Sequence, residues 1–285
     1  MKITELFLSQ ERTFSFEFFP PKDEISAVDF GINVGQLMRL SPSFVTVTYG
    51  AGGSNQHKTF DLVNYLQNKI GLTTSAHYTC VNASRDKIEE DLKYLQSINI
   101  ENLMLLRGDP PKGQDKFIAP KDGFKYASDL IDFVDNNYDF AKAGACYVEK
   151  HPEAHSIEED IANLKTKVDA GADYLITQLF FNNEYYFDFV KKARAAGITS
   201  RIIPGIIPIT AFRQIERFTK MSGTKIPPEL TVRMQEHKDN PAKTYQIGVD
   251  YTISQCRELL AAGAPGIHFY TLNKSRAAIE IFESL

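Results

Sequence analysis

One carboxylate stands inside an aromatic run near the start of the chain. Glu17 lies in the sequence FSFEFFPP, between Phe16 and Phe18. Burial of an ionised carboxylate among apolar groups costs free energy, so this environment favours the protonated acid. A protonated carboxylic acid held in place can act as a general acid. Glu17 is therefore a candidate catalytic residue; the alternative is an ion pair with a basic neighbour in the core.

A second candidate site follows the apolar run NLMLL, where the chain continues as RGDPP. Arg107 could hold a phosphate or carboxylate group through parallel N–H bonds. Asp109 could accept a hydrogen bond from a heterocyclic N–H group. The alternative is that Arg107 and Asp109 form an ion pair at the rim of the fold.

Other apolar runs also end in polar residues. Gln178 precedes an aromatic stretch, and its amide would need hydrogen-bond partners that a heterocyclic substrate or a backbone carbonyl could supply. The segment YVEKHPEAH alternates acids with histidines, but its proline and its lack of helical spacing argue against a metal site. The remaining polar residues at the ends of these runs are Thr46, Thr48, Tyr49, His77, Tyr147, Glu149, His151, Glu153, Thr177, His268, Tyr270 and Asn273.

Eight apolar, β-branched or aromatic runs are expected to be strands. They cover residues 14–19, 44–49, 73–79, 102–107, 143–148, 174–180, 201–207 and 266–272. Segments whose apolar residues lie three or four positions apart alternate with them and are expected to be helices. These cover residues 25–40, 59–70, 87–98, 127–134, 157–170, 184–195, 211–221, 245–262 and 275–285.

Strands that alternate with helices pair in parallel, either in a doubly wound open sheet or in a closed barrel. The count of eight favours a barrel, and no Gly-x-Gly-x-x-Gly follows the first strand, which argues against a Rossmann site. The expected fold is α/β, a single (β/α)8 TIM barrel over residues 1–285, with its active site at the carboxyl ends of the strands. Residues 109–124 and 223–240 are expected to be loops.

The bulk composition excludes several classes of protein. Basic residues number 32 and acidic residues 36, with no dense basic run, so no nucleic-acid partner is expected. Cys80, Cys146 and Cys256 are far apart and form no Cys-x-x-Cys, which indicates reduced thiols in the cytoplasm. The N-terminal stretch MKITELFLSQERTF has no apolar run of signal-peptide length, and no run of about 18 apolar residues occurs, so no membrane partner is expected.

The sequence resembles the methylenetetrahydrofolate reductase family over nearly its whole length. The motifs that carry the resemblance are SFEFFPPK (15–22), VTYGAGGS (47–54), AHYTC (76–80), LRGDPP (106–111), YASDL (126–130), HPEAH (151–155), KVDAGADYLITQLFF (167–181), IIPGIIPI (202–209) and HFYTLNKS (268–275). The resemblance implies an FAD-binding barrel that reduces 5,10-methylenetetrahydrofolate to 5-methyltetrahydrofolate. It also implies NADH, or else NADPH, as the electron donor, a ping-pong order and a role in methionine synthesis.

The resemblance implies roles for individual residues. Glu17 would protonate N10 of the folate and open its five-membered ring, and Asp109 would lie beside the pyrimidine edge of the flavin and the pterin. Substrate contacts would come from Glu17, Asp109, Gln178, Gln214, Phe218 and Lys274. FAD contacts would come from Thr48, Tyr49, Ala51, His77, Arg107, Gly108, Asp109, Tyr126, Ala127, Tyr147, His151, Ala154, Asp160, Asn163 and Lys167. No metal is implied.

Lys274 departs from the family pattern, which often has arginine here. Its charge could meet the glutamate tail of folate, but lysine cannot form the two-pronged contact of arginine. The C-terminal regulatory domain of the animal enzymes is not expected, and a homo-oligomer is. Two competing hypotheses are a folate-binding methyltransferase barrel without flavin and a non-catalytic barrel subunit.

Overall fold

The computed structural model describes residues 1–49, 56–108 and 117–285. All paired strands run parallel in one sheet with the order β7-β6-β5-β4-β3-β2-β1-β9-β8. The strands are β1 (Thr13–Phe18), β2 (Phe44–Val47), β3 (Thr74–Thr79), β4 (Asn102–Leu106), β5 (Ala141–Cys146), β6 (Tyr174–Thr177), β7 (Arg201–Ile203), β8 (Gly205–Ile206) and β9 (Gly266–Tyr270). Each of the eight expected strands is therefore present.

The two ends of this sheet meet at a single residue. β7 pairs with β6, and β8 pairs with β9, while Pro204 alone separates β7 from β8 in the chain. Proline has no N–H group to donate to a sheet ladder, so it divides one strand into two. The carbonyl of Pro204 still accepts a hydrogen bond of 2.9 Å from the backbone of His268. β7 and β8 thus form the seventh strand of a closed barrel, which confirms the expected (β/α)8 fold.

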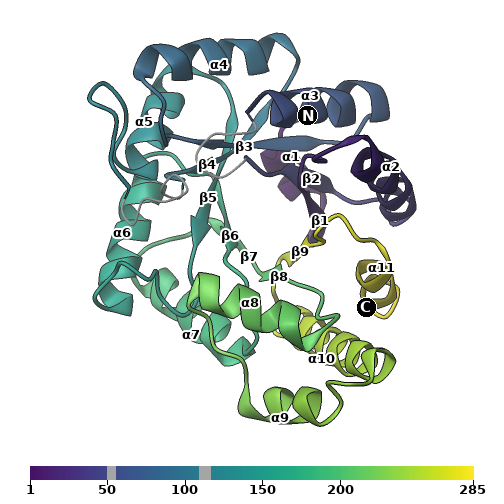
Figure 1. The fold of residues 1–285 in the computed structure, drawn as a ribbon. Coiled ribbons are helices and arrows are strands. Elements are labelled where there is room, and N and C mark those ends of the chain that lie inside the picture. Colours follow the sequence, from purple (N-terminus) through teal and green to yellow (C-terminus); the bar gives the residue numbers. More distant parts are fainter. Residues whose placement is uncertain (50–55, 109–116) are drawn as a thin grey trace.

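The helices surround the barrel on its outer side (Figure 1), except for the first one, whose side chains enter the barrel. They are α1 (Ile3–Ser9), α2 (Glu24–Met38), α3 (Gln56–Tyr65) with its π-helical continuation η2 (Leu66–Ile70), α4 (Arg85–Ser97), α5 (Ala127–Asn137), α6 (Ile157–Asp169), α7 (Asn183–Ala195), α8 (Phe212–Ser222), α9 (Pro228–Glu236), α10 (Pro241–Ala261) and α11 (Arg276–Phe282). Among the described residues, no helix is both long and apolar enough to span a membrane.

Two of these helices were not expected from the sequence. Residues 223–240 were predicted to be a loop, and this is wrong for α9, which begins with a proline and buries Leu230 and Met234 four residues apart. Of the predicted loop 109–124, residues 109–116 lie outside the described part, and 117–124 contain neither helix nor strand. The short α1 inserts Ile3 and Leu6 into an apolar cluster inside the barrel.

Side chains alternate along each strand between the barrel interior and the helix layer. On β1, Phe16 and Phe18 join the cluster that packs against the helices, including Phe30 of α2. Ser15 and Glu17 are buried on the opposite face. A second apolar cluster combines α1 with inward side chains such as Phe44 and Tyr174. The fold thus directs Glu17 into a barrel interior that is apolar at one end.

Candidate active site

Glu17 lies between two imidazole rings near the carboxyl end of β1. In the sheet it stands opposite Thr46 of β2 and Tyr270 of β9. Its Oε2 atom is 3.5 Å from Nε2 of His77 and 3.9 Å from Nε2 of His268. The Glu17 and His77 side chains are each only 9% exposed. The structure therefore joins residues from β1, β3 and β9 around one buried carboxyl group.

The imidazole of His77 is neutral at neutral pH. Burial lowers its pKa to about 4, although the charge of Glu17 acts in the opposite direction. The pair is consequently not an ion pair at neutral pH, despite the short distance between the two groups. Nε2 of His77 is buried and has no hydrogen-bond partner among the described residues. Buried polar atoms in proteins are nearly always hydrogen-bonded, so this nitrogen is suited to a ligand that enters the barrel.

His268 is held by neighbours within the barrel. Its Nδ1 atom lies 2.8 Å from Oγ of Ser15, and its ring stacks on Phe44 with centroids 6.3 Å apart. On the same side, Oγ1 of Thr271 donates a 2.7 Å hydrogen bond to the carbonyl of Glu17. Ser15 was missed by sequence reasoning, yet it stands two residues before Glu17 and so shares its face of the strand. These contacts position Glu17 from the β9 side.

Arg107 has a partner that the sequence did not indicate. Its two terminal nitrogens donate to both carboxylate oxygens of Glu153, at 2.7 and 2.6 Å. Glu153 is 60% exposed, so it can move away if an anionic ligand competes for the guanidinium group. The alternative Arg107–Asp109 pair falls on a residue outside the described part.

Gly108 follows Arg107 in a conformation that favours glycine. Its φ angle is +88°, and a β-carbon there would lie 2.9 Å from Cγ1 of Val81 and 3.0 Å from Cβ of Thr79. A larger residue would be strained by both the backbone and its neighbours. The position just after β4 therefore has no room for a side chain.

A second group of predicted cofactor residues gathers between β5 and α6. Oδ2 of Asp160 accepts a 2.8 Å hydrogen bond from the backbone of His151, whose ring meets Tyr147 edge-on at 4.7 Å. Lys167 donates to the carbonyl of Ala145 at 2.5 Å, and burial lowers its pKa. A partly desolvated ammonium group of this kind is suited to an anion. Ala154 is buried in the same segment, whereas Asn163 is exposed on α6.

The acid and histidine segment before α6 does not converge on a metal. Glu149 accepts a hydrogen bond from the backbone of Lys225 at 3.2 Å, while Glu153 pairs with Arg107. Within residues 1–49, 56–108 and 117–285, no three His, Cys, Asp or Glu side chains are grouped to hold a metal ion.

Gln178 lies just after the end of β6. Its backbone N–H donates a 2.7 Å hydrogen bond to the carbonyl of Cys146, and its Oε1 atom accepts a 2.9 Å hydrogen bond from the backbone N–H of Leu179. The chain just beyond it is anchored by α10. The hydroxyl of Tyr251 donates a 2.6 Å hydrogen bond to the carbonyl of Phe181, and the amide of Gln255 donates a 3.0 Å hydrogen bond to the carbonyl of Phe180.

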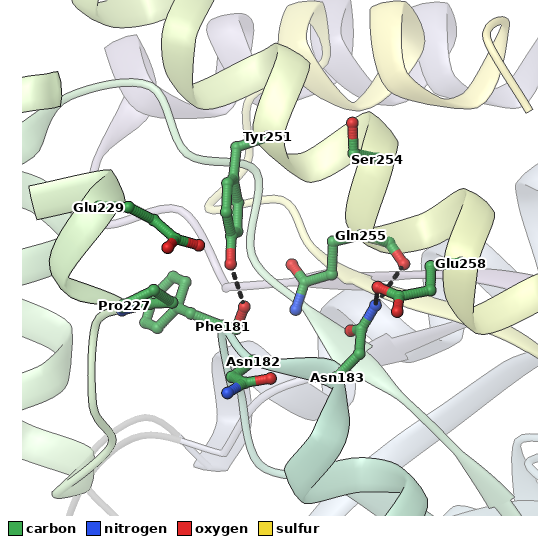
Figure 2. Close-up of a pocket in the computed structure, with 9 residues that line it drawn as sticks. All are labelled: Phe181, Asn182, Asn183, Pro227, Glu229, Tyr251, Ser254, Gln255 and Glu258. Atoms are coloured by element: carbon green, nitrogen blue, oxygen red, sulfur yellow. Dashed lines mark hydrogen bonds between the residues drawn. The ribbon is translucent and has the colours of Figure 1, made fainter.

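A polar cavity of about 260 Å³ lies beside these anchors (Figure 2). Its lining comes from α7, α9, α10 and the segment that leads into α7, and it includes none of the predicted site residues. Asn183 lines one side of this cavity. Its side-chain amide donates hydrogen bonds to the carbonyl of Gln255 at 3.1 Å and to the carboxylate of Glu258 at 2.6 Å. These bonds tie α7 to α10 and so hold the segment that follows Gln178.

The other predicted site residues are more dispersed. Gln214 accepts a 2.6 Å hydrogen bond from the hydroxyl of Thr210, Phe218 packs in an apolar cluster, and Lys274 is exposed. No hydrogen bond or ion pair in the described part of the chain joins these three to Glu17. The backbone N–H of Thr48 donates to the carbonyl of Phe18, and the ring of Tyr49 packs on that of Tyr78. Tyr126 is exposed just before α5, and Ala127 is the first residue of that helix. Ala51 and Asp109 lie outside the described residues.

The described residues fit a flat heterocyclic cofactor that carries phosphate. Buried polar atoms without partners occur on neighbouring strands, at Oγ1 of Thr46, Nε2 of His77 and Oγ1 of Thr79. Arg107 supplies a cationic group just after β4, and Lys167 of α6 supplies another beside Ala145 of β5. Polar atoms of this type could bind the ring edges, while the two cations could bind the phosphates.

The fold and this site define a (β/α)8-barrel protein with a buried acid near the carboxyl ends of its strands. The family model described as methylenetetrahydrofolate reductase matches residues 2–285, and the chain belongs to that family. It is 36% identical to 5,10-methylenetetrahydrofolate reductase of Escherichia coli K12, over 95% of this chain and 90% of that protein. The expected family is therefore confirmed.

Other relatives are longer. The chain is 38% identical to methylenetetrahydrofolate reductase (NADH) 1 of Zea mays, over 100% of this chain but 50% of the maize protein, so it spans half of that relative. Among solved structures, an uncharacterised Clostridium thermocellum protein that binds two copies of 5-methyl-5,6,7,8-tetrahydrofolic acid has a TM-score of 0.64 at 14% identity. That alignment covers 100% of this chain and 97% of the other. At this identity the likeness supports the fold alone.

Proposed function

We propose that this chain is a flavin-dependent 5,10-methylenetetrahydrofolate reductase that works as one catalytic barrel over residues 1–285. The observation that carries the proposal is the buried carboxyl group of Glu17 beside a neutral His77 in a member of this family. The reaction uses NADH and yields 5-methyltetrahydrofolate, in the cytoplasm, as a methyl source for methionine synthesis. NADH is preferred to NADPH because the names of the plant relatives include it.

Glu17 acts as the general acid of the folate half-reaction. It delivers a proton to N10 of the substrate, which breaks the bond from N10 to the bridging carbon and leaves a 5-iminium cation to accept hydride. Burial among aromatic side chains keeps water away from this proton. Because His77 is neutral, it forms no ion pair with Glu17, and the hydrogen bond between Ser15 and His268 fixes the imidazole on the opposite side.

FAD, when bound, would supply the hydride chemistry that links NADH to the folate. Arg107 and Lys167 would hold its phosphates, and Glu153 would then leave the guanidinium group of Arg107. His77, Thr48 and Tyr49 would contact its rings. The remaining proposed FAD contacts are Ala51, Gly108, Asp109, Tyr126, Ala127, Tyr147, His151, Ala154, Asp160 and Asn163.

Asp109 and Gln178 orient the pterin, while Gln214 and Phe218 line the side shared by folate and nicotinamide. Lys274 is exposed, so it is available for the glutamate tail of folate. Its single ammonium group binds a carboxylate less specifically than arginine does. We further propose that the enzyme is a homo-oligomer.

The test is anaerobic stopped-flow absorbance of the purified protein, with NADH added first and methylenetetrahydrofolate second. Bleaching of the flavin band by NADH and its return on addition of the folate are the expected results. A protein that shows no flavin band after FAD is supplied would overturn the reductase proposal and favour a flavin-free folate methyltransferase.

A further inference from the structure

Helix α2 turns an apolar stripe toward solvent. Ile25, Val28 and Ile32 are 80%, 65% and 57% exposed, and their spacing of three and four residues places them on one side of the helix. The opposite side carries the buried Phe30 and Leu37. Figure 1 shows α2 at the outer edge of the molecule. An amphipathic surface helix normally presents polar residues there, so this stripe indicates a contact surface.

Two glycines extend the same stripe. Gly31 and Gly35 are exposed, and a β-carbon at either would meet nothing within 4 Å. Neither has the positive φ angle that would require glycine. Glycine is also a poor helix former, so nothing in the described part of the single chain accounts for two of them in the middle of α2. Small residues on an outer helix face allow the backbone of a second helix to approach closely.

Charges stand at the two ends of the stripe. Glu24 begins α2, and Arg39 is its C-cap residue, and both are exposed. Neither forms an ion pair with another residue in the described part of the chain. Glu24 precedes the apolar residues and Arg39 follows them. The two lie equally far along the sequence from the point between Gly31 and Ile32.

We propose that α2 pairs with α2 of a second copy of this chain, antiparallel, about a two-fold axis between Gly31 and Ile32. In this register Glu24 of each copy faces Arg39 of the other, so both charges gain a partner. Val28 faces Gly35, and Ile32 faces Gly31, so each branched side chain enters a space left by a glycine. A two-fold contact must be complementary to itself in this way.

The partner is a second copy of this chain, because the charge pattern and the large-to-small pattern both match under one two-fold rotation. A stable dimer buries about 800 Å² on each partner, so the contact extends beyond the stripe onto neighbouring helices. This inference does not depend on the proposed reductase activity, since it concerns assembly on an outer face of the barrel.

The test is sedimentation velocity of the full chain over a hundredfold range of concentration. The wild-type protein is expected to form a dimer, or a larger even-numbered assembly that contains this dimer. Gly35→Leu is expected to weaken that contact by at least about 100-fold, because leucine fills the space that Val28 of the second copy needs. Leucine also favours the helix, so the melting temperature of the variant should not fall. Val232→Glu is the matched control for an exposed apolar residue on another helix.

Charge reversal tests the antiparallel register. Glu24→Arg and Arg39→Glu should each weaken dimerisation by about three- to tenfold, and the double variant should restore it. A monomeric wild-type protein at the highest concentration would overturn the proposal. So would a Gly35→Leu variant that assembles as the wild type does. A double charge variant no better than either single one would refute this register.

Discussion

Nε2 of His77 lies 3.5 Å from Oε2 of Glu17, and the two side chains are equally buried. Because burial lowers the pKa of His77 to about 4, the imidazole stays neutral beside the carboxyl group at neutral pH. A charged imidazole at this distance would stabilise the ionised carboxylate. The neutral ring instead forms no ion pair with this carboxyl group, which is the proposed general acid.

Glu17→Gln separates the two half-reactions. The variant should bind FAD and still be bleached by NADH, since hydride transfer to the flavin needs no acid at this position. Its oxidation by methylenetetrahydrofolate should slow by at least about 100-fold, because glutamine cannot donate a proton to N10. Single-turnover stopped-flow measures both steps. A folate half-reaction near the wild-type rate would remove Glu17 from the role of acid.

The depressed pKa of His77 predicts a loss of stability in acid. The unfolded chain protonates this histidine below about pH 6.5, while the folded protein keeps it neutral down to about pH 4. The unfolded state therefore binds more protons in this window, and the free energy of unfolding falls as the pH is lowered. The contribution reaches about 3 kcal/mol at pH 4.

Urea denaturation of the wild type and of His77→Gln, from pH 7.5 to 4.5, measures this effect. The variant should lose less stability on acidification than the wild type does. His155, which is exposed, provides the matched control for removal of an imidazole. Parallel stability profiles for wild type and His77→Gln would show that another group accounts for the loss.

Arg107 and Glu153 offer a pair of variants with opposite effects. Arg107→Gln should weaken FAD binding by about 10- to 100-fold, because a charge-assisted contact to phosphate is lost. Glu153→Gln should leave FAD affinity unchanged or raise it, since the guanidinium group is freed. Stability should change little in either variant, because Glu153 is 60% exposed. Titration of the apoprotein with FAD measures both, and equal affinities in both variants would indicate a purely structural rim pair.

Gly108→Ala should introduce both backbone strain and steric clashes with neighbouring side chains, whereas Gly263→Ala should introduce backbone strain alone. Both glycines have φ angles near +89°, but a β-carbon at Gly263 meets nothing within 4 Å. Gly263→Ala should cost about 1 kcal/mol from the backbone alone. Gly108→Ala should cost about 2–3 kcal/mol, because Val81 and Thr79 must also move. Equal losses in chemical denaturation would show that the neighbours of Gly108 yield without cost.

The sequence by itself predicted the barrel and its central acid. Strand positions follow from runs of apolar residues, and alternation along β1 places Glu17 on the face opposite Phe16 and Phe18. These features are local, because burial selects side chains at the period of each element. The same period also predicted the positions of most helices. It did not reveal α1, which is only seven residues long, or α9, which lies in a polar segment with two prolines.

Only the tertiary structure decided which polar groups meet. The Arg107–Glu153 pair spans 46 residues, and the Ser15–His268 contact spans 253, across the strands that close the barrel. Spacing along the chain carries no signal for such contacts, since they depend on strand register and on the right choice among many possible partners. The low pKa of His77 likewise arises from burial by the whole barrel, which no short segment of sequence can show.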